Sequence, residues 1–167
     1  GKWIAFIGKR DGADNAQVQL LPTEGGDARA LTSHATPATS PSWSPDGRSI
    51  AYSSYTRVHP QIIVSNVYQG TRETLTDEKS SAYMPVYAPD GSRIAFMSQR
   101  DGNSEIYVMN RDGSGARRLT NHPSADVTPT WSPTGTQIGF TSDRSGSPQI
   151  WVMDADGLNL RRITIGE

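Results

Sequence analysis

Apolar residues of this chain come in short runs that recur with a fixed period. The turn sequences WSPDG, YAPDG and WSPTG begin at Trp43, Tyr87 and Trp131, so the period is 44 residues both times. A similar apolar run follows each turn and also opens the chain: Ile4-Ala5-Phe6, Ile50-Ala51-Tyr52, Ile94-Ala95-Phe96 and Ile138-Gly139-Phe140. A fixed period of this length indicates a chain built from repeated structural units.

Each repeat is predicted to contain four short strands. The aromatic before the turn ends the first strand, and the apolar run after the turn forms the second. The third strand follows at Val18–Leu21, Ile62–Val64, Ile106–Met109 and Ile150–Met153. The fourth precedes a Leu-Thr or Ile-Thr pair, whose first members are Leu31, Leu75, Leu119 and Ile163. No segment has a sustained helical spacing of apolar residues, so we expect essentially no helix.

Four strands over about 40–45 residues are typical of a β-propeller blade. We therefore predict an all-β propeller domain over residues 1–167, with repeats at 1–46, 47–90, 91–134 and 135–167. The first of the four strands is the inner strand of a blade. The first blade is expected to lack it, because nothing in this sequence precedes Gly1. The prediction is therefore three strands in the first blade and four in each of the others.

The middle strands of each repeat are apolar on both faces, so each small sheet should be covered by its neighbours on both sides. The first and last repeats would each leave one such face uncovered. An array of repeats that does not close needs capping or association. We therefore expect a partial ring, or a ring completed by blade-to-blade association into a homo-oligomer.

The balance of charge gives no support to two classes of partner. Lysine and arginine number 16 against 17 aspartates and glutamates, which gives a formal net charge of −1. This balance favours neither nucleic acid nor an anionic membrane surface. No apolar run approaches the roughly 18 residues of a membrane span. We expect no nucleic-acid binding and no membrane insertion.

Candidate catalytic and metal-binding residues are few. The chain has no cysteine and three histidines, His34, His59 and His122. His34 and His122 follow the Leu-Thr pair in equivalent places, which favours a shared loop role; the alternative is a ligand at the rim or central channel, with Asp126. No Gly-x-Ser-x-Gly nucleophile motif occurs. We predict no enzymatic activity, no cofactor and no metal.

Arginines cluster on the predicted fourth strands, at Arg29, Arg72, Arg117-Arg118 and Arg161-Arg162. They could form a nucleic-acid-binding stripe. Exposed charge on an outer edge strand also prevents aggregation, and the balanced net charge favours this second interpretation.

The polar loops between the second and third strands form the candidate partner-binding surface, because loops at one end of a propeller are common docking sites. The candidate residues are Arg10, Asp11, Arg57, His59, Arg100, Asp101, Asn103, Asp143 and Arg144.

The combination of P-x-W-S-P-D-G-x-x-I-A-F, I-Y-V-M-x-x-D-G and R-R-L-T resembles the TolB-like β-propeller repeat family. The match covers practically the whole chain and is best over residues 80–165. The first repeat, from Gly1 to Thr32, is also similar to propeller blades of prolyl-oligopeptidase-family peptidases. TolB-like propellers usually have more than four blades, and this sequence departs from the family there.

The resemblance implies a non-enzymatic periplasmic domain that serves as an interaction scaffold for a protein partner. Two other interpretations of the chain are open. It is the non-catalytic propeller of a prolyl-oligopeptidase-type peptidase, or it is an engineered or excised fragment that self-assembles. A metal or small ligand in the central channel is a third.

Overall fold

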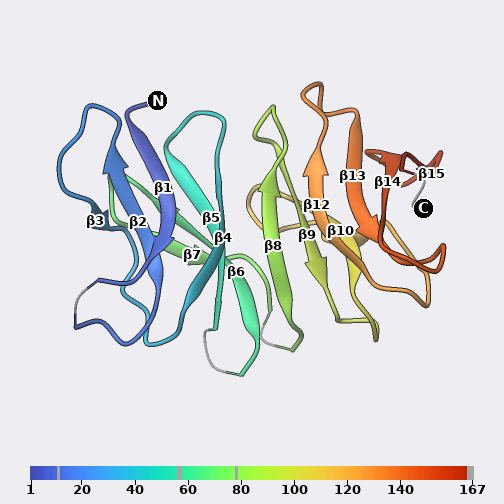
Figure 1. The fold of residues 1–167 in the computed structure, drawn as a ribbon, viewed down its shortest axis with the longest axis horizontal. Helices are drawn as coiled ribbons and strands as arrows, with labels where there is room; N and C mark the ends of the chain where they lie inside the picture. Colours follow the sequence, from blue (N-terminus) through green and yellow to red (C-terminus); the bar gives the residue numbers. More distant parts are fainter. Residues whose placement is uncertain (11, 56–57, 78, 165–167) are drawn as a thin grey trace.

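The computed structural model describes residues 1–10, 12–55, 58–77 and 79–164, and these residues form strands joined by turns and loops (Figure 1). No described segment is a helix, so none is a helix that could cross a membrane. The strands are β1 (Trp3–Gly8), β2 (Gln17–Pro22), β3 (Arg29–Ala30), β4 (Ala38–Trp43), β5 (Ser49–Tyr55), β6 (Pro60–Asn66), β7 (Arg72–Thr74), β8 (Ala82–Tyr87), β9 (Arg93–Ser98), β10 (Glu105–Asn110), β11 (Arg117–Arg118), β12 (Asp126–Trp131), β13 (Gln137–Ser142), β14 (Gln149–Asp154) and β15 (Arg161–Arg162).

The strands form four antiparallel sheets in chain order. The first sheet is β1-β2-β3, and the other three each have four strands, β4 to β7, β8 to β11 and β12 to β15. Every hydrogen-bonded pair joins strands that are consecutive in the sequence. The predicted all-β blades are confirmed, including the missing inner strand of the first blade.

A repeated turn, S-P-D-G, A-P-D-G or S-P-T-G, joins the first two strands of each four-stranded sheet. In the second sheet the N–H of Gly47 donates to the carbonyl of Ser44 at 2.9 Å, and Gly47 has a φ of 67°. Proline suits the second turn position, and glycine suits the left-handed backbone at the fourth. A sequence repeat counted from this glycine therefore contains the last three strands of one sheet and the first strand of the next.

Each inner strand carries a β-bulge just before a proline. The pairing register shifts between Thr39 and Ser42 in β4, and the same shift recurs in β8 and β12. The residue before the proline has a positive φ each time: Ser40, Met84 and Thr128, at 52–53°. Because proline has no N–H to give to a ladder, it is found at edges and bulges of sheets. The bulge accounts for the proline that lies two residues before the aromatic at each turn. We call these aromatics, Trp43, Tyr87 and Trp131, the corner aromatics.

Neighbouring sheets pack face to face through apolar side chains. Ala51 and Ile62 of the second sheet join Ile94, Phe96 and other residues of the third in one buried cluster. Ala95 and Ile106 of the third sheet contact the fourth in the same way. The small alanine lets the next sheet approach closely, as the sequence predicted.

The four sheets form an open array. Contacts between sheets run only from the first to the second, the second to the third and the third to the fourth. No strand of the first sheet contacts the fourth among the described elements. Large apolar side chains are exposed at both ends: Ile4, Phe6 and Ile7 in the first sheet, and Ile150, Leu158, Leu160 and Ile163 in the fourth. The ring is partial, as the number of repeats suggested.

The corner aromatics are buried where a complete inner strand precedes them. Tyr87 is 5% exposed and Trp131 is 9% exposed. The indole N–H of Trp131 donates to the carbonyl of Val86 in the preceding inner strand at 3.1 Å. Trp43 is only half-buried, because the first sheet has no inner strand to cover it.

Replacing Trp131 with alanine should lower the free energy of unfolding by about 3–5 kcal/mol, because it empties a packed corner and removes a partly buried hydrogen bond. Urea unfolding followed by circular dichroism measures this loss. Leu158→Ala is the control, since Leu158 is 63% exposed. A loss for Trp131→Ala no larger than that of the control would contradict the packing of the corner.

Candidate partner-binding face

The loops that join the second and third strands of each repeat lie at one end of the array. Because adjacent strands are antiparallel, the β1–β2, β5–β6, β9–β10 and β13–β14 hairpins all turn at this end, seen along the lower edge of Figure 1. We call this end the hairpin face. The connections from each sheet to the next also cross it (Figure 1).

Arginines at equivalent places brace the hairpins of the third and fourth sheets. The Nε of Arg100 donates to Ser98 Oγ at 3.1 Å, and its guanidinium lies 4.9 Å from the ring centre of Tyr107. Arg144 repeats the arrangement, with Ser142 Oγ at 3.0 Å and the Trp151 ring at 5.0 Å. A guanidinium over an aromatic face is attracted by the negative charge of that face.

Arg144 also closes a buried ion pair. Its Nη2 lies 2.5 Å from Oδ2 of Asp126, and the two side chains are 10% and 0% exposed. A buried carboxylate needs such a partner, because burial of an unpaired charge is costly. Arg144 is therefore held inside the fourth sheet rather than presented to a partner, and Asp126 is its buried counter-ion.

Asn103 fastens the β9–β10 hairpin to the β11–β12 loop, and Asp101 makes a hydrogen bond within the hairpin. The Nδ2 of Asn103 donates to the carbonyls of His122, Pro123 and Ser124, at 2.7, 3.3 and 3.0 Å. Asp101 accepts a hydrogen bond from the phenol of Tyr107. These bonds order the hairpin and leave half of the Asp101 side chain exposed.

The remaining candidate residues differ in their access to solvent. Arg10 and Asp143 are exposed, and Arg10 donates to the carbonyl of Ala28 at 3.0 Å. His59 is half-buried, with Nδ1 3.5 Å from Ser81 Oγ. Asp11 and Arg57 lie outside the described residues. Among the candidate residues that the structure describes, the exposed charges are thus Arg10, Asp101 and Asp143.

One repeated side-chain contact under this face was not predicted from the sequence. The threonine of each Leu-Thr or Ile-Thr pair donates to a glutamine or glutamate at the start of the third strand. It also accepts from the main-chain N–H of the residue that follows this glutamine or glutamate. The four pairs are Thr32 with Gln17, Thr76 with Gln61, Thr120 with Glu105 and Thr164 with Gln149. The recurring Thr and Gln/Glu were visible in the sequence, but their spacing alone does not show that they meet.

The third sheet has a charged version of this contact. Glu105 is fully buried, and its carboxylate accepts from Arg118 Nη2 at 2.6 Å and from the N–H of His122 at 2.7 Å. Nδ1 of His122 accepts from the N–H of Ser124 at 3.1 Å. His122 is therefore part of the loop structure.

His34 links the first two sheets. Its Nε2 lies 2.8 Å from the Tyr52 hydroxyl, and its Nδ1 lies 3.3 Å from Nη1 of Arg72. Burial, with a smaller contribution from the charge of Arg72, lowers the pKa of His34 below 6.5. Neither His34 nor His122 belongs to a cluster of three metal-ligand residues within the described ranges.

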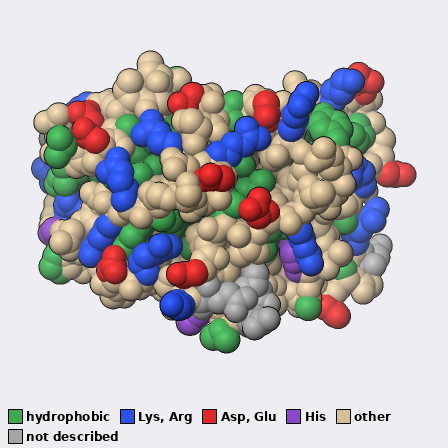
Figure 2. Space-filling view, turned by 180° about the vertical axis from the view of Figure 1, so that it is seen from behind, with side chains coloured by type: hydrophobic (Ala, Val, Ile, Leu, Met, Phe, Trp, Pro, Cys, Tyr) green, Lys and Arg blue, Asp and Glu red, His purple; other side chains and the backbone are tan. Residues whose placement is uncertain are grey.

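Two of the fourth-strand arginines bridge neighbouring sheets. Arg29 donates to the carbonyl of Val67 at 3.1 Å, and Arg117 donates to the carbonyls of Ala155 and Asp156 at 3.3 and 3.1 Å. The expected edge charge therefore also has a packing role at these two positions. Arginine is not gathered into a single basic stripe on the side shown in Figure 2, where blue and red side chains are interspersed.

Stability should fall as the pH drops below 6.5, in part through His34. Its folded-state pKa is lowered, so below 6.5 the unfolded chain binds a proton that the folded chain resists. Above 6.5 this contribution is fully present, and it is lost as the pH falls toward the folded-state pKa. Urea midpoints above and below pH 6.5 measure it.

The control for this effect is His34→Gln, which keeps a polar group at the site without a titrating one. The difference in midpoint between the two pH values should be smaller in this variant. An equal difference in both proteins would show that His34 does not contribute.

Comparison with known proteins agrees with this architecture. The family model described as "TolB beta propeller domain" matches residues 2–167. The Tol-Pal system protein TolB of Nitrosomonas europaea is 40% identical over 70 residues, which are 42% of this chain and 16% of that protein. A solved structure described as a putative TolB from Agrobacterium tumefaciens superposes with a TM-score of 0.88 at 29% identity, over 97% of this chain and 61% of that one.

A peptidase is also among the relatives. The uncharacterized peptidase YuxL of Bacillus subtilis is 50% identical over 50 residues, which are 30% of this chain and 8% of that protein. The chain thus spans much less than two thirds of these curated relatives. The family model, in contrast, matches almost every residue, and the chain therefore belongs to the TolB beta propeller domain family.

Proposed function

We propose that residues 1–167 form one non-enzymatic domain that acts as a protein-interaction scaffold and binds its partner through the hairpin face. The observation that carries the proposal is the bracing of the hairpins: Arg100 and Asn103 hold the loop of the third sheet, and Arg144 holds that of the fourth. Ordered loops lose little conformational entropy on binding. Arg10, Asp101 and Asp143 then offer exposed charges of both signs.

The relatives support a protein partner and an extracytoplasmic location. TolB relatives are described as proteins of the Tol-Pal system. By resemblance to them, we place the chain in the periplasm, with a protein of such an envelope system as its partner.

A peptidase propeller is the alternative, favoured by the match to YuxL. On that alternative the parent protein also carries a hydrolase domain, and the propeller limits access to it. The parent reading frame would then contain a Gly-x-Ser-x-Gly motif. Under either proposal residues 1–167 should not hydrolyse peptides or esters, and turnover that persists through repurification would contradict both.

The proposed face can be tested with the soluble domain of a Pal protein as the partner. The double variant Arg10→Glu/Asp143→Lys should weaken binding by about three- to tenfold, because it reverses two exposed charges at the rim of the face. Calorimetric titration measures the affinity, and hydrogen exchange should show protection in the β9–β10 and β13–β14 hairpins. Protection confined to the opposite end would refute the face.

The matched control is Asp156→Lys, which reverses an exposed charge in the β14–β15 turn at the other end of the array. It should leave the affinity unchanged. An equal loss in the control would mean that overall charge, rather than the hairpin face, sets the affinity.

We also propose that a second copy of the chain covers the exposed end faces. Ile150 of the fourth sheet is 42% exposed, whereas Ile62 and Ile106, at the same place in the second and third sheets, are fully buried by the next sheet. Phe6 of the first sheet is 38% exposed, whereas its counterpart Phe96 is fully buried. The fourth sheet of one copy and the first sheet of another are therefore complementary, as consecutive sheets are within the chain.

Light scattering after size exclusion should show a mass that is a multiple of 18.1 kDa and falls on dilution. Ile150→Asp should shift the population to the monomer, because it places a charge in the contact. Val58→Asp is the control, since Val58 is 71% exposed in a hairpin. A wild-type monomer at all concentrations would refute association.

A further inference from the structure

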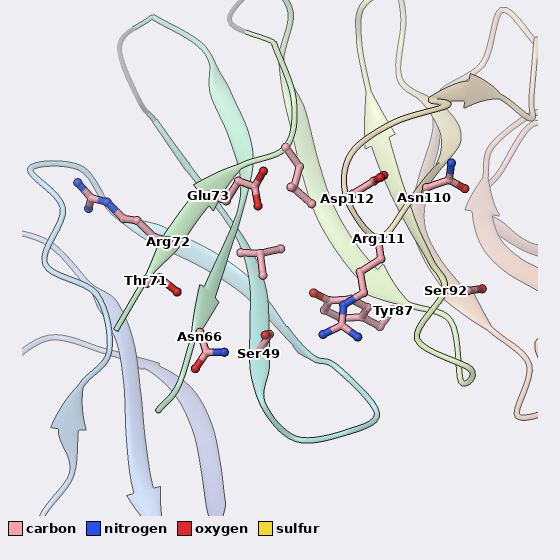
Figure 3. A pocket seen from close by; sticks show the side chains of 12 residues that line it. Ser49, Asn66, Thr71, Arg72, Glu73, Tyr87, Ser92, Asn110, Arg111 and Asp112 are labelled. Carbon is pink, nitrogen blue, oxygen red and sulfur yellow. The ribbon is translucent and has the colours of Figure 1, made fainter. Parts of the chain in front are cut away.

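A groove opens between the second and third sheets, at the end of the array opposite the hairpin face. Its volume is about 750 Å³ (Figure 3). One wall comes from the second sheet and includes Ser49, Val64 and Glu73; the other comes from the third and includes Tyr87 and Arg111. The groove lies between sheets whose packing repeats elsewhere in the chain, so its neighbours show what normally fills it.

The next groove along the array, between the third and fourth sheets, has an arginine over its corner aromatic. The guanidinium of Arg93 lies 4.8 Å from the ring centre of Trp131. In the groove between the second and third sheets, Tyr87 takes the place of Trp131 and Ser49 takes the place of Arg93. The short serine leaves open the space that a guanidinium fills in the repeat.

A second arginine is also replaced. Arg29 and Arg117 bridge from one sheet to main-chain carbonyls of the next, as described above. The equivalent residue in this groove is Glu73, and the carbonyls opposite belong to Arg111 and Asp112. Both arginines found in the neighbouring groove are therefore absent here, and a carboxylate stands in the place of one of them.

Tyr87 has a polar group without a partner in this groove. Its ring lines the groove, and its hydroxyl is buried with no hydrogen bond among the described residues. Burial raises the pKa of Tyr87 to about 12, so the phenol is neutral and its oxygen can accept a hydrogen bond. A buried polar group left unpaired is destabilising, and a donor from a ligand would relieve that cost.

The charged residues that line the groove are two arginines, Arg72 and Arg111, and two carboxylates, Glu73 and Asp112. Arg111 is already paired with Asp46 at 3.4 Å, and Arg72 points away from the groove and contacts His34 (Figure 3). Glu73 makes no ion pair with a described residue and faces the groove. Asp112 lies on the opposite wall and adds a second negative charge.

We infer that this groove binds the guanidinium group of an arginine side chain from a partner protein. Such a group would pair with Glu73 and donate to the carbonyls of Arg111 and Asp112, as Arg117 does to Ala155 and Asp156. Its planar fork of donors suits several acceptors at once, whereas a lysine ammonium is a compact point charge. The apolar stem of the arginine would lie against Val64 and Leu75.

This site is separate from the hairpin face and does not depend on it. A small arginine probe tests the groove without any partner protein, so the outcome is independent of the experiment with Pal. A partner that used both surfaces would contact both ends of the array at once.

The test is a titration of the full chain, labelled with ¹⁵N, with N-acetyl-arginine methylamide. Amide shifts should change at Ser49, Arg111 and Asp112 and saturate. Glu73→Gln should weaken binding about tenfold, because a charge-assisted hydrogen bond is lost. Ser49→Arg should abolish binding, because it recreates the filled groove of the next repeat.

Two controls make the result specific. Glu24→Gln removes an exposed carboxylate in the first sheet's β2–β3 connection and should leave binding unchanged. N-acetyl-lysine methylamide should bind at least several-fold more weakly than the arginine probe. The inference is overturned by equal binding of both probes, by binding that survives Glu73→Gln and Ser49→Arg, or by the absence of shifts up to the solubility limit of the arginine probe.

Discussion

The fold depends on the burial of apolar sheet faces between neighbouring sheets: both faces of the second and third sheets, and one face of the first and of the fourth. None of these sheets is large enough to shield its own apolar strands, so stability comes from stacking. Ala51 and Ala95 make the stacking close, and Ile62 and Ile106 fill the space beside them. Ile150 of the fourth sheet, in the place of Ile62 and Ile106, has no following sheet against it in this array and stays exposed.

The strands and turns were predictable because their causes are local. Proline and glycine at fixed places in the S-P-D-G turn restrict a few backbone angles, and alternating turns and apolar runs mark the strands. The bulge at Ser40, Met84 and Thr128 was not predicted, because a positive φ before proline goes against the local preference of the backbone. The surrounding sheet imposes it, and that information lies outside the segment.

The candidate site was predictable only in outline. The sequence places polar loops at one end, but it does not show which of their charges are internally satisfied. Arg144 meets Asp126 of the inner strand and Trp151 of the third strand, and these partners are near it only once the sheet has formed. The same holds for Glu73 and Ser49. They stand where the next groove has arginines, and this difference is apparent only when the two grooves are compared.

The absence of contact between the first and fourth sheets also bears on how the chain folds. Contacts between the described strands stay within a sheet or reach the adjacent sheet, so this array forms without pairing of its first and last sheets. Low sequence separation of contacts favours fast folding, and nearest-neighbour coupling lets structure nucleate at any interface and spread outward. The second and third sheets, each covered on both sides, are then the core onto which the outer two add, and the outer two are the first to open in local unfolding.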